Sequence, residues 1–537
     1  MNMPGTSCTK ALVSSQKAES FFFYLLLFAN TLPVLLFQSF PTVDGPAHLY
    51  NARLIVDLLS NPASPLSAFL MFNSQLNPNL IGHVILGSLM VFFPALLAEK
   101  IFLLSYLIFF PLTFRYLFDV LRLKGQYLVY FVFPFTYSFL FYYGFYNFNI
   151  GLVFLFLSLA LWIRYLRMGF TFRRMAILGI LSLFVFFSHL FVFAILLLAV
   201  AIINLKEVLP LLSTTIADKK RILISWLQQI FILMPGIVLT VVYFATHPAG
   251  SGNSQYLSIN ELLMMIKQVQ PAKGIDYGKE DIFSKWIFVL FALISGFHLA
   301  KFLIRPRKVV MVDSVVWGSL VAVTLLLFMV MPNMIKGSIG FVSSRLLVFF
   351  FLFLIVFLAS LRTPIWLKII AFAIINYVNI ALINVYVTAA QRLNNVAEQV
   401  TKTSEIIEPY STVYPIYHSE EWIFTHISNY LGIDKPLVIT DNIEASLNYF
   451  PLVWKRSQMP HLHLGNPKSR HEILPSHNPN QKQQIDYVFL FLDETSYESE
   501  ISMMEAHPFL SQYYYKIFEG DNKQVRLYKR KGYLGKH

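Results

Sequence analysis

Charged residues are scarce in this chain. Asp, Glu, Lys and Arg together make up 13% of the 537 residues, whereas 56% are hydrophobic. A soluble domain carries about 25% charged residues, so the composition excludes a fully water-exposed protein. It predicts a chain that is largely embedded in a membrane.

Cysteine and the common site motifs are also nearly absent. Cys8, in the N-terminal tail, is the only cysteine, so no intrachain disulfide can form. No Asn-x-Ser/Thr sequon occurs, which favours a bacterial membrane over a glycosylating compartment. The sequence has neither a phosphate-binding Walker loop nor a Cys/His pattern with zinc spacing, and we expect no cofactor. Four tail histidines lie in a proline-rich stretch that favours chance spacing over a metal site: His461, His463, His471 and His477.

The net charge of +13 comes from Lys and Arg in short clusters between apolar runs, without one continuous basic face. This pattern argues against a nucleic acid partner and is typical of the cytoplasmic loops of membrane proteins. With the N-terminal tail, it places 19 basic residues on one side of the membrane and seven on the other. The N-terminus is therefore predicted to be cytoplasmic and the C-terminus to lie outside. The clusters are Arg115/Arg122/Lys124, Arg164/Arg167/Arg173/Arg174, Lys206/Lys219/Lys220/Arg221, Lys301/Arg305/Arg307/Lys308 and Arg362/Lys368.

Long apolar runs recur through the first 390 residues. We expect about eleven transmembrane helices within residues 20–390, after a cytoplasmic tail of residues 1–19. The predicted orientation requires that Leu80 to Ala98 does not cross the membrane. It also requires that Met175 to Asn204 forms two short helices that meet outside near His189. The expected spans are 20–40, 101–118, 126–142, 149–163, 175–188, 190–205, 223–244, 285–303, 312–331, 346–361 and 367–388.

After Gln391 the pattern changes to short β-rich runs separated by helical or polar stretches. Residues 391–537 are therefore predicted to form a small extracytoplasmic α/β domain. The segment Glu519-Gly-Asp-Asn522, between the last two runs, indicates a hairpin turn. The expected strands are Pro436–Thr440, Tyr487–Leu492, Tyr513–Phe518 and Val525–Lys529.

The predicted outer loop, residues 41–100, begins with an unusually polar segment that includes Thr-Val-Asp44-Gly-Pro-Ala-His48-Leu-Tyr-Asn51. A helix that begins near Pro46 has Asp44 at its N-terminus, with His48 and Asn51 on the same face. Two interpretations are open. Asp44 is an ordinary helix N-cap next to an interfacial histidine, or these groups form a catalytic site at the mouth of the membrane body.

This arrangement resembles the GT-C class of membrane glycosyltransferases. That class contains protein O-mannosyltransferases, the aminoarabinose transferase of lipid A and the catalytic subunit of oligosaccharyltransferase. The resemblance consists of one span, an outer loop that opens with an acidic residue and amphipathic helices, many short spans and a C-terminal outer domain. It covers most of the chain as a layout and only a few residues as a motif.

The resemblance implies that Asp44 is the catalytic carboxylate, because the acidic residue shortly after the first span has this role in the class. Gly45 stands where some members have the second carboxylate of an Asp-Glu pair, which implies a metal-independent reaction. An acceptor hydroxyl that attacks the anomeric carbon of a lipid-phosphate sugar must lose a proton. Asp44 is the candidate general base for that proton.

The leaving phosphate requires a cation at the same membrane face. Arg345 is the first candidate and Lys336 the second, since both lie in a glycine-bearing outer loop that opens a span. The loop resembles the Arg-bearing outer loop that handles lipid phosphate in the GT-C class. The alternative for Arg345 is a snorkelling side chain at a helix end.

A second outer turn, Tyr142 to Gly151, is rich in aromatic residues and contains Asn147 and Asn149. These groups suit sugar stacking and hydroxyl binding, but an aromatic belt at the membrane interface has the same composition. His189 could face the same cavity, or it could hydrogen-bond a helix end.

The sequence thus predicts an inverting glycosyltransferase at the outer face of a bacterial inner membrane, surrounded by membrane lipids. Its donor would be a polyprenyl-phosphate sugar and its acceptor an envelope lipid, glycan or protein. One alternative is a transporter or lipid flippase, which needs ionisable residues or broken helices near mid-membrane. Another is a non-catalytic envelope scaffold whose tail domain binds a partner.

Overall fold

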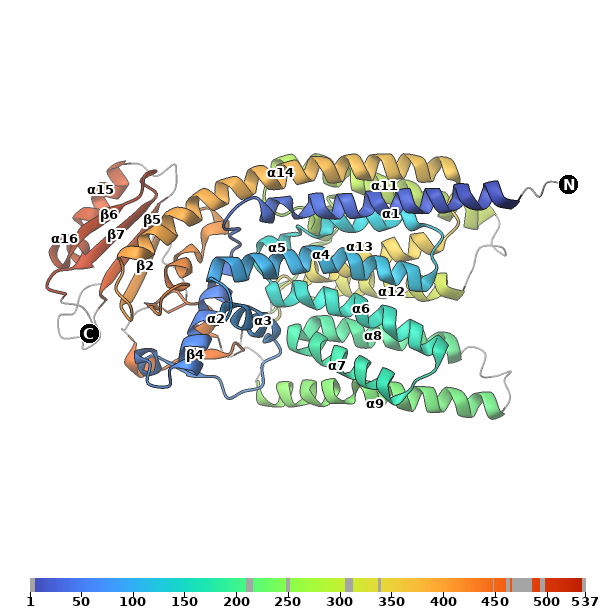
Figure 1. Cartoon of the computed structure of the whole chain (residues 1–537), viewed down its shortest axis with the longest axis horizontal. Helices are drawn as coiled ribbons and strands as arrows, with labels where there is room; N and C mark the ends of the chain where they lie inside the picture. Colours follow the sequence, from blue (N-terminus) through green and yellow to red (C-terminus); the bar gives the residue numbers. More distant parts are fainter. Residues whose placement is uncertain are drawn as a thin grey trace.

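The computed structural model describes residues 5–208, 216–247, 252–304, 312–336, 340–447, 449–459, 464–465, 485–492 and 498–533. The four tail histidines that were assigned to chance spacing lie outside these ranges. Helices run side by side along the long axis of the molecule and form its main body (Figure 1). The bundle contains α1 (Gly5–Leu35), α4 (Ala95–Leu121), α6 (Tyr146–Met168), α7 (Phe172–Ser188), α8 (Leu190–Val208), α9 (Ile216–Thr246), α11 (Tyr277–Ile304), α12 (Val312–Val330), α13 (Val342–Ser360) and α14 (Ile365–Ile406).

Among the described residues, seven helices are long and apolar enough to cross a membrane. The chain is therefore a polytopic helical membrane protein. Helices α7, α8 and α12 lie in the same bundle but are not among the seven (Figure 1). Helix length and composition thus do not confirm the expected count of about eleven spans. The seven are Lys17–Leu35, Ala95–Leu121, Tyr146–Met168, Lys219–Thr246, Tyr277–Ile304, Val342–Ser360 and Ile365–Ile406.

The segment predicted as a span over 126–142 is not a continuous α-helix. It forms the 10-residue 3₁₀ helix η2 (Gln126–Phe135), followed by the single turn α5 (Phe139–Tyr142). Pro134 has no N–H to donate to a regular helical turn. Because a 3₁₀ helix rises about 2.0 Å per residue, η2 covers about 20 Å with few residues. The residues from Tyr127 to Phe135 are buried, which keeps this irregular backbone away from lipid.

Two other sequence predictions agree with the helix boundaries. Helix α7 ends at Ser188 and α8 begins at Leu190, so the long apolar stretch is divided at His189. Helix α3 (Ile81–Met90) has 10 residues and a length of about 15 Å, which is too short to cross a bilayer.

The C-terminal region contains a mixed sheet, which has five strands in the order β3-β2-β5-β7-β6 in the described part of the chain. Strands β2, β3 and β5 are parallel, whereas β7 pairs antiparallel with β5 and β6. The four predicted strands are present, and the predicted turn joins β6 to β7. Strand β2, which lies between β3 and β5, was not predicted, because Pro415 interrupts a run that otherwise resembles a strand. The strands are β2 (Thr412–His418), β3 (Val438–Ile439), β5 (Tyr487–Leu492), β6 (Tyr514–Glu519) and β7 (Val525–Arg530).

The two faces of this sheet pack on different sets of residues. Phe489 and Phe491 of β5 belong to the hydrophobic core that continues into the membrane bundle. Val488 and Leu490 face the other side and pack in a smaller cluster with residues of α15 (Glu498–Ala506) and α16 (Pro508–Tyr513). The sheet is therefore built onto one end of the bundle, opposite the end that carries the N-terminus (Figure 1).

The outer loop and the C-terminal region are interleaved. Strand β1 (Leu70–Phe72) pairs antiparallel with β4 (Leu452–Trp454). The Tyr50 hydroxyl donates to the Leu437 carbonyl at 2.6 Å and accepts from the Ile439 N–H at 3.2 Å. Helix α2 (Gly45–Ser60), which carries Tyr50, consequently lies between the membrane bundle and the sheet (Figure 1).

The N-terminus of α2 docks on the turn between α5 and α6. The Asp44 N–H donates to the Tyr143 carbonyl at 3.1 Å. Gly144 has a φ of +84°, and a Cβ atom there would lie 2.7 Å from the backbone nitrogens of Asp44 and Gly45. A Cβ atom on Gly45 would lie 2.3 Å from the Tyr146 hydroxyl. Only glycine at both positions allows the two predicted outer segments to approach this closely.

We predict that Gly144→Ala lowers the thermal midpoint of the detergent-solubilised protein, because a methyl group must displace the backbone at Asp44. Gly169→Ala is the matched control, since Gly169 also has a positive φ, +77°, but nothing lies within 4 Å of its added Cβ. The control should lose only the conformational term, on the order of 1–3 kcal/mol. Equal midpoints for the two variants would contradict a close contact at Gly144.

Candidate active site

Asp44 precedes α2, as expected from the sequence, but its side chain does not cap the helix. The carboxylate accepts no capping hydrogen bond. Its Oδ1 atom lies 3.9 Å from Nε2 of His426. Burial lowers the pKa of His426 to about 4, so this imidazole is uncharged near neutral pH. The Asp44 side chain therefore does not make the hydrogen bond to a backbone N–H of α2 that defines an N-cap.

The Asp44 side chain is 23% exposed and lies in an environment that disfavours its charge. Burial raises the pKa of Asp44 to about 7; nearby His48 opposes the shift and nearby Glu444 adds to it. A carboxylate with a pKa near neutrality is a much better proton acceptor than one with an ordinary value. This electrostatic setting suits a general base.

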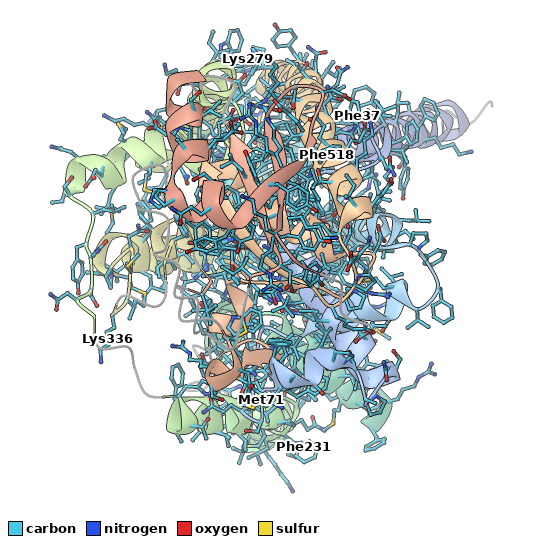
Figure 2. The ribbon with its side chains drawn as sticks, turned by 90° about the vertical axis from the view of Figure 1, so that its left-hand side faces the viewer. Phe37, Met71, Phe231, Lys279, Lys336 and Phe518 are labelled. Atoms are coloured by element: carbon cyan, nitrogen blue, oxygen red, sulfur yellow. The ribbon has the colours of Figure 1, made fainter. Side chains whose placement is uncertain are left out.

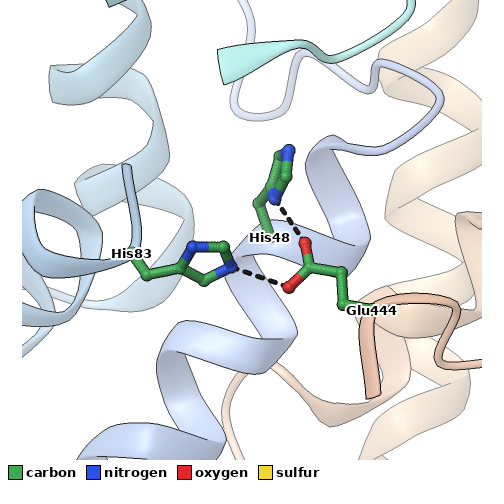
Figure 3. Close-up of side chains that lie close together, drawn as sticks. All are labelled: His48, His83 and Glu444. Atoms are coloured by element: carbon green, nitrogen blue, oxygen red, sulfur yellow. Dashed lines mark hydrogen bonds and ion pairs between the residues drawn. The ribbon is translucent and has the colours of Figure 1, made fainter. Parts of the chain in front are cut away.

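His48, His83 and Glu444 form a buried cluster (Figure 3), and the charges of His48 and Glu444 act on Asp44. Glu444 Oε2 lies 2.7 Å from His83 Nε2, and Glu444 Oε1 forms an ion pair with His48 Nδ1. The side chains come from α2, from α3 and from the short helix η8 (Glu444–Ser446) of the C-terminal region. Burial favours the neutral form of His48, but the charge and hydrogen bond of Glu444 outweigh it and raise the His48 pKa.

The predicted residues Asn51 and Asn147 hold this cluster in place. Asn51 and Asn442 exchange reciprocal side-chain hydrogen bonds of 2.8 and 2.9 Å, and Asn442 Oδ1 also accepts from the Ala445 N–H. Asn51 thereby positions the turn that carries Glu444. Asn147 Oδ1 accepts from the Gly82 N–H at 2.7 Å and so positions the start of α3, next to His83. Both side chains act through neighbours of the cluster.

Arg345 and Asn149 are buried polar groups on adjacent helices. The Arg345 guanidinium stacks over the Phe145 ring, with 4.8 Å from its central carbon to the ring centroid. Asn149 lies one helical turn after Phe145 on α6, and neither end of its amide has a hydrogen-bond partner among the described residues. Arg345 forms no ion pair with a described carboxylate. The Arg345 Nε atom and both polar atoms of the Asn149 amide therefore have room for a contact with a water, an ion or a ligand.

The structure does not bring Lys336 and His189 into the Asp44 cluster. Lys336 is exposed, and Figure 2 shows it at the margin of the molecule. Its N–H donates to the Ser254 hydroxyl at 3.1 Å. His189 Nδ1 accepts from the Phe191 N–H at 3.1 Å, which is the contact of a helix-end residue, and its ring packs edge-on against Phe148.

Sequence reasoning did not identify His83, Glu444 or His426. His83 is a single histidine in an apolar helix, and Glu444 is one acidic residue in a C-terminal turn, so neither belongs to a recognisable motif. Their only sequence signal is polarity in a segment predicted to lie at the outer face. Their contacts depend on tertiary structure.

His48, His83 and Glu444 are also the one set of described residues that could hold a metal ion. One ligand atom from each lies within 4.8 Å of the others. The sequence prediction contained no metal ligand, and the GT-C resemblance implied a metal-independent reaction.

Neither a protein-family model nor a curated protein matches the sequence. The fold and the site define a polytopic membrane protein in which the end next to the C-terminal sheet combines a carboxylate with a raised pKa, a buried histidine-carboxylate cluster and a buried guanidinium. The GT-C resemblance rests on the layout of the sequence and on a few positions such as Asp44 and the loop of Arg345, and it stays an expectation.

Proposed function

We propose that the chain is an inverting glycosyltransferase that moves a sugar from a polyprenyl-phosphate donor to a hydroxyl group of an envelope acceptor. The observation that supports this best is a poised carboxylate and a buried guanidinium at one end of the bundle. Tyr449 lies within electrostatic reach of both: burial, with the charge of Asp44, raises its pKa to about 12, and the charge of Arg345 opposes the shift.

In the proposed reaction, the acceptor hydroxyl attacks the anomeric carbon from the side opposite the phosphate. The new carbon–oxygen bond forms as the bond to the phosphate oxygen breaks, and the electron pair stays on the phosphate. Asp44 takes the hydroxyl proton. Arg345 compensates the charge on the leaving phosphate, which a guanidinium can bind through two parallel hydrogen bonds.

The burial of Arg345 supports its assignment to the phosphate. A guanidinium that is 8% exposed is costly to bury unless an anion compensates it. A snorkelling arginine would place its head in water, whereas this one stacks on Phe145 inside the protein. An anionic ligand at this position would supply the missing compensation.

We further propose about eleven spans in a bacterial inner membrane, with the N-terminus in the cytoplasm and the site outside. Basic residues at the end of the bundle opposite the sheet support this orientation. There Arg115 pairs with Glu19 at 2.7 Å, and Arg167 donates to the Val120 carbonyl. The positive-inside rule assigns that end to the cytoplasm.

A transporter fits the described residues less well. Glu99 and Glu280 are buried in helices that could span the membrane, and such groups often mark an ion pathway. However, the Tyr146 and Tyr430 hydroxyls donate to Glu99 at 2.8 and 2.9 Å. Glu280 Oε2 accepts three backbone N–H groups at 3.0 to 3.1 Å. Both carboxyl groups are fixed in structural roles near helix ends.

The orientation predicts that alkaline phosphatase fused after His537 is active, because this enzyme matures only outside the cytoplasm. Green fluorescent protein fused at the same position should not fluoresce, because it does not fold correctly when it is exported in unfolded form. A fluorescent fusion together with an inactive phosphatase fusion would place the C-terminal region in the cytoplasm and contradict an outer site.

For the base, we predict that Asp44→Asn reduces transfer by at least about a hundredfold, because the amide cannot accept the proton. Transfer is measured with radiolabelled polyprenyl-phosphate sugars in membranes that contain the native acceptor, at matched protein levels. The control is Asp57→Asn, which makes the same chemical change at another aspartate of the segment. The Asp57 carboxylate accepts a hydrogen bond from the Ser64 hydroxyl, and its replacement should leave transfer unchanged. Full transfer by Asp44→Asn would exclude Asp44 as the base.

For the phosphate contact, we predict that Arg345→Met weakens binding of farnesyl phosphate by about 2 kcal/mol, or about thirtyfold. Binding of farnesol, which lacks the phosphate, should change little. Lys336→Met is the matched control and should bind both ligands like the wild type. The measurement is ligand-induced thermal stabilisation of the purified protein. If Arg345→Met prefers farnesyl phosphate over farnesol by the same factor as the wild type, another group binds the phosphate.

A further inference from the structure

We propose that His48, His83 and Glu444 bind a zinc ion that fastens the C-terminal region to the outer helices. This inference does not depend on the proposed glycosyl transfer. It rests on the identity, burial and placement of three side chains that converge from distant parts of the chain (Figure 3).

The donor set fits zinc. Two imidazoles and one carboxylate are ligands of Zn²⁺ in proteins, whereas Mg²⁺ and Ca²⁺ prefer oxygen ligands alone. Neighbouring ligand atoms around a tetrahedral zinc ion lie about 3.3 Å apart. The His83 Nε2 to Glu444 Oε2 distance is 2.7 Å, so an ion requires the side chains to separate by roughly 0.6 Å.

The hydrogen bonds of His48 leave its Nδ1 atom available as a metal ligand. His48 Nε2 lies 3.0 Å from the Gly144 carbonyl oxygen, which accepts a hydrogen bond, so Nε2 carries a proton. In the neutral imidazole, Nδ1 then has a lone pair directed at the Glu444 carboxylate. In the ion pair with Glu444, a proton on Nδ1 occupies this place, and a metal ion that displaces the proton would bind the same two atoms. A backbone carbonyl on the second nitrogen is the usual support of a metal-binding histidine.

The surroundings of the cluster also suit a metal. His48, His83 and Glu444 are only 2–5% exposed. The Phe450 ring lies against both imidazoles, with centroid distances of 6.1 and 5.8 Å. A divalent ion would compensate the buried negative charge of Glu444. An apolar wall with a local negative charge favours retention of a cation.

The positions of the ligands indicate a clamp. His48 and His83 belong to the outer loop, whereas Glu444 lies 361 residues beyond His83. A single ion would therefore join α2 and α3 to the C-terminal region. Binding of an ion to the folded state alone raises the free energy of unfolding. The clamp should be visible as metal-dependent thermal stability.

The test is metal analysis of the full-length protein in detergent, purified with an affinity tag that contains no histidine. After dialysis against a chelator and titration with ZnCl₂, the wild type should retain about one zinc ion per chain and show a higher thermal midpoint. His83→Ala and Glu444→Gln should retain less than about a tenth of an ion. Glu444→Gln keeps the side-chain shape and can still hydrogen-bond the histidines, so it separates metal loss from misfolding.

The control is His298→Gln, which removes a buried histidine that contacts Thr363 in another part of the bundle. It should bind zinc like the wild type, and the cobalt-loaded forms of both should show the visible absorption of a tetrahedral site. Wild-type protein that takes up no zinc would overturn the proposal, as would equal uptake by Glu444→Gln. Zinc uptake without a change in the thermal midpoint would overturn the clamp.

Discussion

Burial of the first half of α2 between the α5–α6 turn and the C-terminal region determines where the polar groups of the site lie. The residues from Gly45 to Ala52 are buried, although several of them are polar. Polar side chains in such a position need partners inside the protein. His48 meets Glu444, Asn51 meets Asn442, and Tyr50 meets the backbone next to β3. The site can form only when the outer loop and the C-terminal region pack together.

The local part of this arrangement could be predicted from the sequence, because helix periodicity and capping depend on neighbouring residues. The start of α2 near Pro46 and the shared face of His48 and Asn51 follow from residue type and spacing. The partners could not be predicted, since Glu444 has no motif and its contact with His83 spans 361 residues. Strand β2 was missed for a different reason. Pro415 is unusual inside a sheet, yet β2 is buried and pairs with both β3 and β5.

Asp44 and Arg345 show how the same burial has opposite consequences for two charges. The Asp44 carboxylate can bind a proton, so burial raises its pKa and makes it a better proton acceptor near neutral pH. Arg345 cannot lose its proton near neutral pH, so burial makes it dependent on an anion. A lipid-linked sugar phosphate would bring a hydroxyl-reactive carbon and that anion in one molecule. The two charges are thus complementary features of one proposed donor site.

The C-terminal region contributes more than a cover for the membrane bundle. Its residues between β2 and β5 supply Glu444 to the histidine cluster, His426 to the surroundings of Asp44 and Tyr449 to those of Arg345. His48 lies one helical turn after Asp44, so any group that fixes His48 also fixes the position of the carboxylate. The metal clamp would act through this turn and fix the position of the Asp44 carboxylate relative to the Arg345 guanidinium. A region without a catalytic motif of its own would then complete a site whose proposed base and proposed phosphate ligand both come from the membrane body.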